Sequence, residues 1–147
     1  MKTALITGAT SGIGEATARL LATNGWRVIG TGRRQERLDK LADELGADRF
    51  LGLAFDVRDA EARNAAIDGL PEDWAQIDLL VNNAGLAKGL NPAQSADLSD
   101  WQVMIDTNVT ALVELTRKML PGLIARKGAM VNIGSVAGSY VYPGGNV

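Results

Sequence analysis

The stretch Gly8-Ala9-Thr10-Ser11-Gly12-Ile13-Gly14 decides the fold, because it stands between a strand pattern and a helix pattern. The short apolar run Ala4–Ile6 precedes it, and the apolar residues from Ile13 to Leu21 recur at helical spacing. Glycines let a backbone turn tightly and approach a phosphate, while the amides that open a helix point at an anion. The stretch therefore predicts a strand-turn-helix unit that holds a pyrophosphate. The residues predicted to bind it are Gly8, Thr10, Ser11, Gly12, Ile13 and Gly14.

The glycine spacing separates this turn from two better-known phosphate loops. It is Gly-x-x-x-Gly-x-Gly, whereas the usual dinucleotide fingerprint is Gly-x-Gly-x-x-Gly. No Lys-Ser or Lys-Thr pair follows the glycines, so the turn is not a P-loop. A tight turn without any ligand remains the alternative interpretation.

Strand and helix patterns alternate along the rest of the chain. Strands are expected at residues 4–6, 26–31, 50–55, 77–81 and 129–133. Helical stripes follow the first three strands, and Gly46 is expected to end the second of these helices. Ser99 resembles the start of a capping box, which predicts a long helix from about there to Leu120, with a kink or break before Pro121.

This alternation predicts a doubly wound, Rossmann-like α/β fold. Strands that alternate with helices pair in parallel through right-handed crossovers, and strands this apolar suit a sheet covered on both faces. We expect five strands in the order 3-2-1-4-5 and a single nucleotide-binding domain over residues 1–147.

Composition excludes several classes of chemistry. The 147 residues are 46% hydrophobic, which is enough for one globular domain, and the net charge of -2 disfavours nucleic-acid binding. The sequence has no Cys and no His, which removes disulfides, Cys- or His-ligated metal sites and imidazole proton transfer. No metal site is expected. Proton chemistry must use Tyr, Lys, Ser, Asp or Glu.

The sequence also carries no signal for membrane insertion or export. It has no run of 18 apolar residues, and the apolar stretch near the N-terminus is short and interrupted by Gly8. We therefore expect a cytoplasmic protein without a membrane partner.

The end of the second strand indicates which nucleotide is bound. In this architecture an acidic side chain there contacts a ribose 2′-hydroxyl, whereas Arg accommodates a 2′-phosphate. The sequence reads Gly30-Thr31-Gly32-Arg33-Arg34 and places two guanidinium groups there instead of an acid. Arg33 and Arg34 therefore predict NADP rather than NAD, unless both are simply solvated residues at a helix start.

With these residues identified, the chain resembles the short-chain dehydrogenase/reductase family over its whole length. Thr7-Gly8-x-x-x-Gly12-Ile13-Gly14 is similar to that family's glycine motif, and Asn82-Asn83-Ala84-Gly85 is similar to its second signature. The resemblance implies cofactor contacts at Asn83, Ala84 and Gly85, and adenine contacts at Asp56 and Val57. It also implies that Ser135 hydrogen-bonds the substrate oxygen and that Asn108 supports a water-linked proton relay.

Within the family the closer resemblance is to bacterial NADP-dependent 3-hydroxy acid dehydrogenases, which include serine and allo-threonine dehydrogenases. It is carried by the stretches at residues 31–38, 81–90, 104–108 and 132–139. The resemblance implies hydride transfer between NADP(H) and a small hydroxy acid or carbonyl compound, and assembly into a homodimer or homotetramer.

The family also uses a Tyr with a Lys four residues later, since a nearby ammonium favours the phenolate. Here the positions four residues after Tyr140 and Tyr142 hold Gly144 and Asn146. We expect both tyrosines to line or underlie the cleft rather than to act in catalysis. The chain is then the N-terminal portion of a dehydrogenase, inactive by itself, and an apolar free edge at strand 129–133 favours this interpretation. The alternatives are a non-catalytic nucleotide-binding or sensing module and, more weakly, a domain without a ligand.

Overall fold

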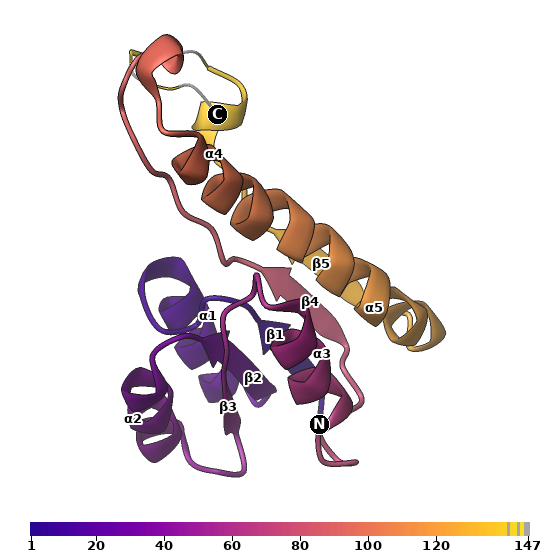
Figure 1. Cartoon of the computed structure of the whole chain (residues 1–147). Coiled ribbons are helices and arrows are strands. Elements are labelled where there is room, and N and C mark those ends of the chain that lie inside the picture. The colour runs from indigo at the N-terminus through magenta and orange to yellow at the C-terminus, as the bar shows by residue number, and fades with distance from the viewer. Residues whose placement is uncertain (141, 144, 146–147) are drawn as a thin grey trace.

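The computed structural model contains a five-stranded parallel sheet with helices on both faces (Figure 1). It describes residues 1–140, 142, 143 and 145, so Val141, Gly144, Asn146 and Val147 lie outside the described residues. None of the helices in this described part has the length and apolar character needed to cross a bilayer. The elements in chain order are β1 (Thr3–Ile6), α1 (Gly12–Thr23), β2 (Arg27–Gly32), α2 (Gln35–Leu45), β3 (Phe50–Ala54), α3 (Ala60–Asp68), β4 (Leu79–Asn82), a 3-10 turn (Ala93–Ser95), α4 (Leu98–Ile105), a π-turn (Asp106–Thr110), α5 (Ala111–Ala125), β5 (Ala129–Asn132) and a second 3-10 turn (Val136–Gly138).

The sheet has the strand order β3-β2-β1-β4-β5, with every neighbouring pair parallel, and this confirms the predicted order and Rossmann-like class. The register of the strands places apolar residues opposite one another across the sheet. Leu5 of β1 lies opposite Ile29 of β2 and Leu80 of β4. Because side chains alternate along a strand, these three point to one face, and Ile6 points to the other.

Each face of the sheet has its own apolar layer. The Leu5 face packs against α3 and α5, and the Ile6 face packs against α1 and α2, so the helices change face once, where the strand order reverses, as in a doubly wound fold (Figure 1). The helical contributors to the two layers are Ile67, Leu115, Met119 and Leu123 on the first face and Ala18, Ala22, Leu38 and Leu41 on the second.

Of the predicted kink or break before Pro121, the break is wrong, because α5 continues through Pro121 to Ala125. Proline lacks an N–H group and crowds the preceding turn, which costs a helix interior about 3 kcal/mol. The buried side chains of Leu115, Met119 and Leu123 bind both ends of α5 to the sheet. Packing along the whole helix therefore outweighs the local cost of the proline.

The predicted long helix from about Ser99 is confirmed, but it differs from the prediction in its capping residue and in containing a π-turn. Asp97 is the N-cap residue of α4, and its carboxylate accepts a hydrogen bond of 2.8 Å from the Ser99 backbone N–H. The carboxylate satisfies the helix start from outside, so the Ser99 hydroxyl is not needed as a cap. A π-turn at Asp106–Thr110 then joins α4 to α5 without a break, since the residues at both junctions keep helical dihedral angles.

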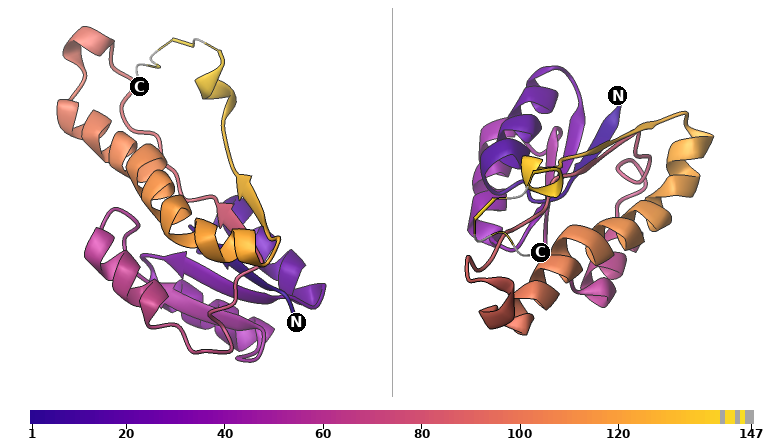
Figure 2. Two further views of the ribbon diagram at one scale, coloured as in Figure 1. Left: turned by 90° about the vertical axis from the view of Figure 1, so that its right-hand side faces the viewer. Right: turned by 90° about the horizontal axis from the view of Figure 1, so that it is seen from above.

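The carboxyl ends of the strands lie together at one edge of the sheet. β1 runs into the glycine turn, β4 into Asn83, and β5 toward Ser135. Figure 2 shows the segments after β4 and after β5 leaving the sheet on the same side. In open α/β sheets this edge is where ligands bind, near the point at which the strand order reverses.

Candidate functional site

A cleft of about 860 Å³ opens at the carboxyl edge of the sheet. It contains nearly all of the residues that the sequence analysis selects, although they come from six separate parts of the chain. Those lining it are Gly8, Thr10, Ser11, Ile13, Arg33, Arg34, Asp56, Val57, Asn83, Ala84, Gly85, Asn108 and Ser135. Gly12 and Gly14 are not among the described residues that line it.

The glycine turn is shaped by close backbone contacts. Gly8 and Gly12 adopt positive φ angles of +70° and +56°, which favour glycine. A Cβ at Gly14 would lie 2.4 Å from the Gly8 carbonyl oxygen and 2.4 Å from Asn83 Nδ2, so Gly14 is needed for packing under the turn. A Cβ at Gly12 would meet nothing within 4 Å.

The start of α1 is left without a side-chain cap. Ser11 is the N-cap residue, and its side chain makes no capping hydrogen bond to the first amides of the helix. Uncapped amides and the positive end of the helix dipole together favour an anion. The turn and the helix start therefore form a site suited to a phosphate group.

Asn83 holds the glycine turn against β4. Its Nδ2 donates to the carbonyl oxygens of Thr7 at 2.9 Å and Gly8 at 3.2 Å. In return, Thr7 Oγ1 accepts from the backbone N–H groups of Asn83 and Ala84 at 3.0 and 2.9 Å. These bonds join residues more than 70 positions apart, and they fix the cleft floor between β1 and β4.

The Asn82 side chain contacts β5 and α5 instead of the glycine turn, so its role is structural. Its Nδ2 donates to Asn132 Oδ1 at 2.9 Å and to Thr116 Oγ1 at 3.0 Å, which joins β4 to β5 and to α5. The two asparagines therefore have different roles. Asn82 joins β4 to β5 and α5, and Asn83 holds the glycine turn.

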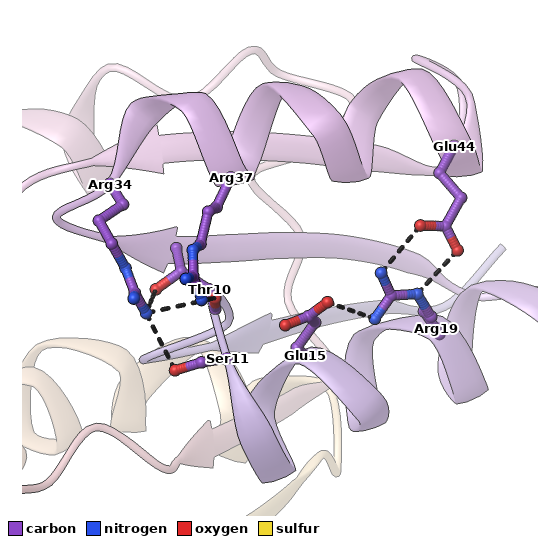
Figure 3. A network of polar contacts seen from close by, with 7 residues as sticks. All are labelled: Thr10, Ser11, Glu15, Arg19, Arg34, Arg37 and Glu44. Carbon is purple, nitrogen blue, oxygen red and sulfur yellow. Dashed lines mark hydrogen bonds and ion pairs between the residues drawn. The ribbon is translucent and has the colours of Figure 1, made fainter.

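Arg33 and Arg34 differ in what they contact, although both line the cleft. The Arg33 side chain is 67% exposed, and its guanidinium lies 4.0 Å from the Asp56 carboxylate. Arg34 instead turns back onto the glycine turn and donates to Thr10 Oγ1 at 2.9 Å and Ser11 Oγ at 3.0 Å (Figure 3). Arg33 is thus the more available of the two for a ligand.

Two arginines that sequence reasoning missed support this end of the cleft. Arg37 donates to the Thr10 carbonyl oxygen at 3.1 Å. Its position three residues after Arg34, on the same face of α2, is a signal that could have found it. Arg63 is buried, donates to the Val57 carbonyl oxygen and pairs with Glu114 of α5. Nothing in its helical surroundings indicates that role.

A third missed residue, Arg58, controls the charge of Asp56. Its side chain holds the Asp56 carboxylate by several contacts, the shortest of 2.7 Å. The hydrogen bond from Arg58 lowers the pKa of Asp56, partial burial opposes this, and the backbone N–H of Arg58 and the charges of Arg58 and Arg33 lower the pKa further. Asp56 therefore stays ionised at the edge of the cleft.

The lowered pKa of Asp56 predicts a pH-dependent contribution to stability. A folded-state pKa below the unfolded value of about 3.9 stabilises the fold above that pH and is lost as pH falls through the folded value. We expect Asp56→Asn to lower the free energy of unfolding at pH 7, and the gap to the parent chain to close below about pH 4. Urea unfolding at pH 7, 5, 4 and 3 measures this, with Asp43→Asn on the exposed face of α2 as a control. A gap of constant size would contradict the assignment.

Asn108 lies in the π-turn and is engaged with the loop after β4. Its Oδ1 accepts from the Leu86 backbone N–H at 2.9 Å, and its Nδ2 donates to the Leu86 carbonyl oxygen at 2.8 Å. The amide therefore holds Leu86, in the loop after β4, beside the cleft. π-Turns of this kind are frequent at functional sites, and this one lies within the long helix beside the cleft.

Ser135 and Tyr142 line the far end of the cleft. Ser135 is exposed, and its Oγ accepts a hydrogen bond of 3.1 Å from the Ala137 backbone N–H. Its hydroxyl proton is therefore free to be donated to a bound oxygen. Tyr142 lines the cleft as the sequence analysis expects, whereas Tyr140 is 73% exposed and is not among the described residues that line it.

A parallel sheet of this order, with a glycine turn and cleft at its switch point, defines a Rossmann-like α/β protein. Comparison with known proteins is specific about the family. The family model described as short chain dehydrogenase matches residues 2–147. The chain belongs to the short-chain dehydrogenase family.

Named relatives and solved structures agree with that assignment. The chain is 57% identical over 145 residues to serine 3-dehydrogenase of Rhizobium radiobacter, covering 99% of this chain and 58% of that protein. It is 53% identical over 144 residues to the NADP-dependent 3-hydroxy acid dehydrogenase YdfG of Salmonella typhi, covering 97% and 58%. The closed form of serine dehydrogenase complexed with NADP+ superposes with a TM-score of 0.93 at 51% identity, again covering 97% and 58%.

A second serine dehydrogenase structure, from Escherichia coli, has a TM-score of 0.92 at 51% identity and covers 97% of this chain and 66% of that one. The chain therefore spans about 58% of the length of the curated relatives it matches.

Proposed function

We propose that residues 1–147 form the nucleotide-binding part of an NADP-dependent oxidoreductase. The reaction is hydride transfer between NADP(H) and a small hydroxy acid or carbonyl compound. One observation carries the proposal: a single cleft holds an uncapped helix start, an available arginine at the end of β2 and a serine hydroxyl. Relatives named as NADP-dependent dehydrogenases support it. Cytoplasmic location and a dimer or tetramer belong to the same proposal, on the strength of the family.

The residues present fit such a dinucleotide. Ser11 and Ile13 line the cleft at the start of α1, where no side chain caps the first amides, so a pyrophosphate in the cleft can accept from these amides. Arg33, with Arg34 beside it, offers planar, charged donors to a 2′-phosphate. Asp56 and Val57 then form the wall for the adenine, and Asn83, Ala84 and Gly85 the floor beneath the rest of the molecule.

At the other end of the cleft the chain supplies orientation of the substrate. When bound, the nicotinamide supplies or accepts the hydride. The Ser135 hydroxyl donates to the substrate oxygen and so holds the reacting carbon in place. Asn108 holds Leu86, in the loop after β4, in position through its two bonds to that residue. Asn108 also belongs to the proposed water-linked proton relay, since its side-chain amide retains one hydrogen and one lone pair beyond its two bonds to Leu86.

Titration of the 147-residue chain with NADPH tests the binding part of this proposal. We expect saturable binding that 2′,5′-ADP displaces, because that fragment carries both the phosphate for the glycine turn and the phosphate for Arg33. We also expect no turnover by this polypeptide, because it contains no Tyr followed four residues later by Lys. A flat titration at millimolar NADPH would contradict the proposal.

A chimera separates an oxidoreductase from a non-catalytic binding module. Residues 1–147 would be joined to the remaining C-terminal portion of the Rhizobium radiobacter relative, to which the chain is 57% identical. An oxidoreductase is expected to oxidise L-serine with NADP+, and Ser135→Ala is expected to lower kcat by about 100-fold. A folded chimera that binds NADPH and has no turnover would favour the module.

A further inference from the structure

We infer that Arg37 is a positioning residue for NADP, an inference that rests on the proposed function. Its guanidinium holds the Thr10 carbonyl and so keeps the glycine turn in shape when Arg34 leaves that turn for the 2′-phosphate. The two arginines lie three residues apart at the start of α2, and both reach across to Thr10 (Figure 3). The Thr10 carbonyl oxygen accepts from Arg37 Nη1 at 3.1 Å and from Arg34 Nη2 at 3.3 Å.

One nitrogen of the Arg34 guanidinium contacts more acceptors than it has hydrogens. Its Nη2 contacts Thr10 Oγ1, Ser11 Oγ and the Thr10 carbonyl oxygen at 2.9, 3.0 and 3.3 Å. One guanidinium nitrogen carries only two hydrogens, so three acceptors share them and the bonds are weak. A phosphate is a stronger acceptor than a hydroxyl or a carbonyl. Arg34 lines the cleft beside Arg33, so a 2′-phosphate bound there draws it away from the turn.

Arg37 differs from Arg34 in where it lies and in whether a bound ligand would compete for its hydrogen bond. It stands outside the set of described residues that line the cleft, and its bond to Thr10 does not compete with a ligand. Once Arg34 has moved to the phosphate, Arg37 is the guanidinium that still ties α2 to the turn. Arg37 therefore matters when a 2′-phosphate is bound, and it is redundant when Arg34 stays on Thr10.

The position of Thr10 matters because the turn fits tightly against β2. A Cβ at Gly32 would lie 2.5 Å from Thr10 Cγ2, and the Ala9 N–H donates to the Thr31 carbonyl oxygen at 2.8 Å. Thr10 itself is buried and directly precedes the N-cap residue of α1. A rotation of the Thr10 peptide would misalign the amides that receive the pyrophosphate.

The same two helices offer a matched control. At the far end of α1, Arg19 donates to Glu44 of α2 at 2.7 and 2.9 Å, and to Glu15 at 2.6 Å (Figure 3). Arg19 and Glu44 are both exposed in part, and they also join α1 to α2. Glu44→Gln therefore weakens the contact between the helices without touching Thr10.

The test is titration of the 147-residue chain and its variants with NADPH and with NADH, together with thermal unfolding. Arg37→Met is expected to weaken NADPH binding about 5- to 20-fold and NADH binding less than about twofold. Arg37→Lys, which keeps one charged donor, is expected to lie between Arg37→Met and the parent chain. Glu44→Gln is expected to leave the ratio of the two dissociation constants unchanged.

A double variant makes the inference sharper. Arg34→Met alone is expected to leave NADH binding nearly unchanged, because Arg37 still holds Thr10. Arg34→Met with Arg37→Met is expected to weaken NADH binding about fivefold or more, since the turn then has neither guanidinium. This loss for NADH, found in the pair and not in either single variant, is the signature of shared support.

Several results would overturn the inference, and they differ from failure of the proposed function. Equal losses for NADPH and NADH in Arg37→Met, no loss for either, or the same shift in Glu44→Gln would each refute it while NADP binding stands. A parent chain that binds neither cofactor would refute the proposed function and this inference together.

Discussion

Gly14→Ala is expected to destabilise the chain by about 3 kcal/mol or more and to abolish nucleotide binding. The new Cβ would lie 2.4 Å from the Gly8 carbonyl oxygen, which is backbone and cannot turn aside. It would also lie 2.4 Å from Asn83 Nδ2, which is held by the carbonyl groups of Thr7 and Gly8. Relief therefore requires the turn to separate from β4. Thermal unfolding is expected to show a midpoint lower by about 10 °C.

Gly122→Ala is the matched control for this prediction. Gly122 lies within α5, its φ is not positive, and a Cβ there would meet nothing within 4 Å. Alanine is the better helix former, so this variant is expected to gain about 0.5–1 kcal/mol. The steric explanation for Gly14 fails if both variants lose stability to the same degree.

The strand order could be predicted because hydrophobic periodicity and the positions of glycines mark where each strand and helix lies. The alternation of strands and helices then indicates a parallel, doubly wound sheet. Gly46 is one such glycine, since it follows the last turn of α2 with a φ of +88° and ends the helix as expected. Pro121 shows the limit, because a local rule places a break where packing of α5 keeps the helix continuous. The π-turn at Asp106–Thr110 has no sequence signal among the patterns considered, since it depends on how α4 and α5 meet the loop after β4.

Many of the residues that line the cleft could be predicted because they belong to recognisable sequence motifs. The residues that hold those lining residues in place could not be predicted, because their contacts depend on the folded structure. Arg33 and Arg34 look equivalent in the sequence, yet one is available in the cleft and the other holds the glycine turn. That difference arises from which acceptors lie within reach once α2 packs beside α1. Arg58 was not predicted, because its bond to Asp56 depends on how the backbone turns after β3, and the sequence spacing alone does not indicate that turn.

Arg33→Gln is expected to weaken NADPH binding by about 10- to 100-fold and to leave NADH binding nearly unchanged. The available Arg33 guanidinium supplies charged hydrogen bonds to a 2′-phosphate, and such bonds contribute about 1.5–3 kcal/mol. NADH has a hydroxyl at that position, so it makes no use of the charge. The effect is expected to exceed that for Arg37, because in the proposed complex Arg33 contacts the phosphate directly, whereas Arg37 acts through Thr10.

Two comparisons make the result for Arg33 decisive. Lys40→Gln removes a positive charge from the exposed side of α2, away from the residues described in the cleft, and is expected to change NADPH binding less than about twofold. Competition by 2′,5′-ADP is expected to fall in Arg33→Gln in step with NADPH, whereas competition by 5′-ADP is not. Equal losses of NADPH and NADH affinity would remove the 2′-phosphate from Arg33, and the cleft would then discriminate between the two nucleotides by some other group.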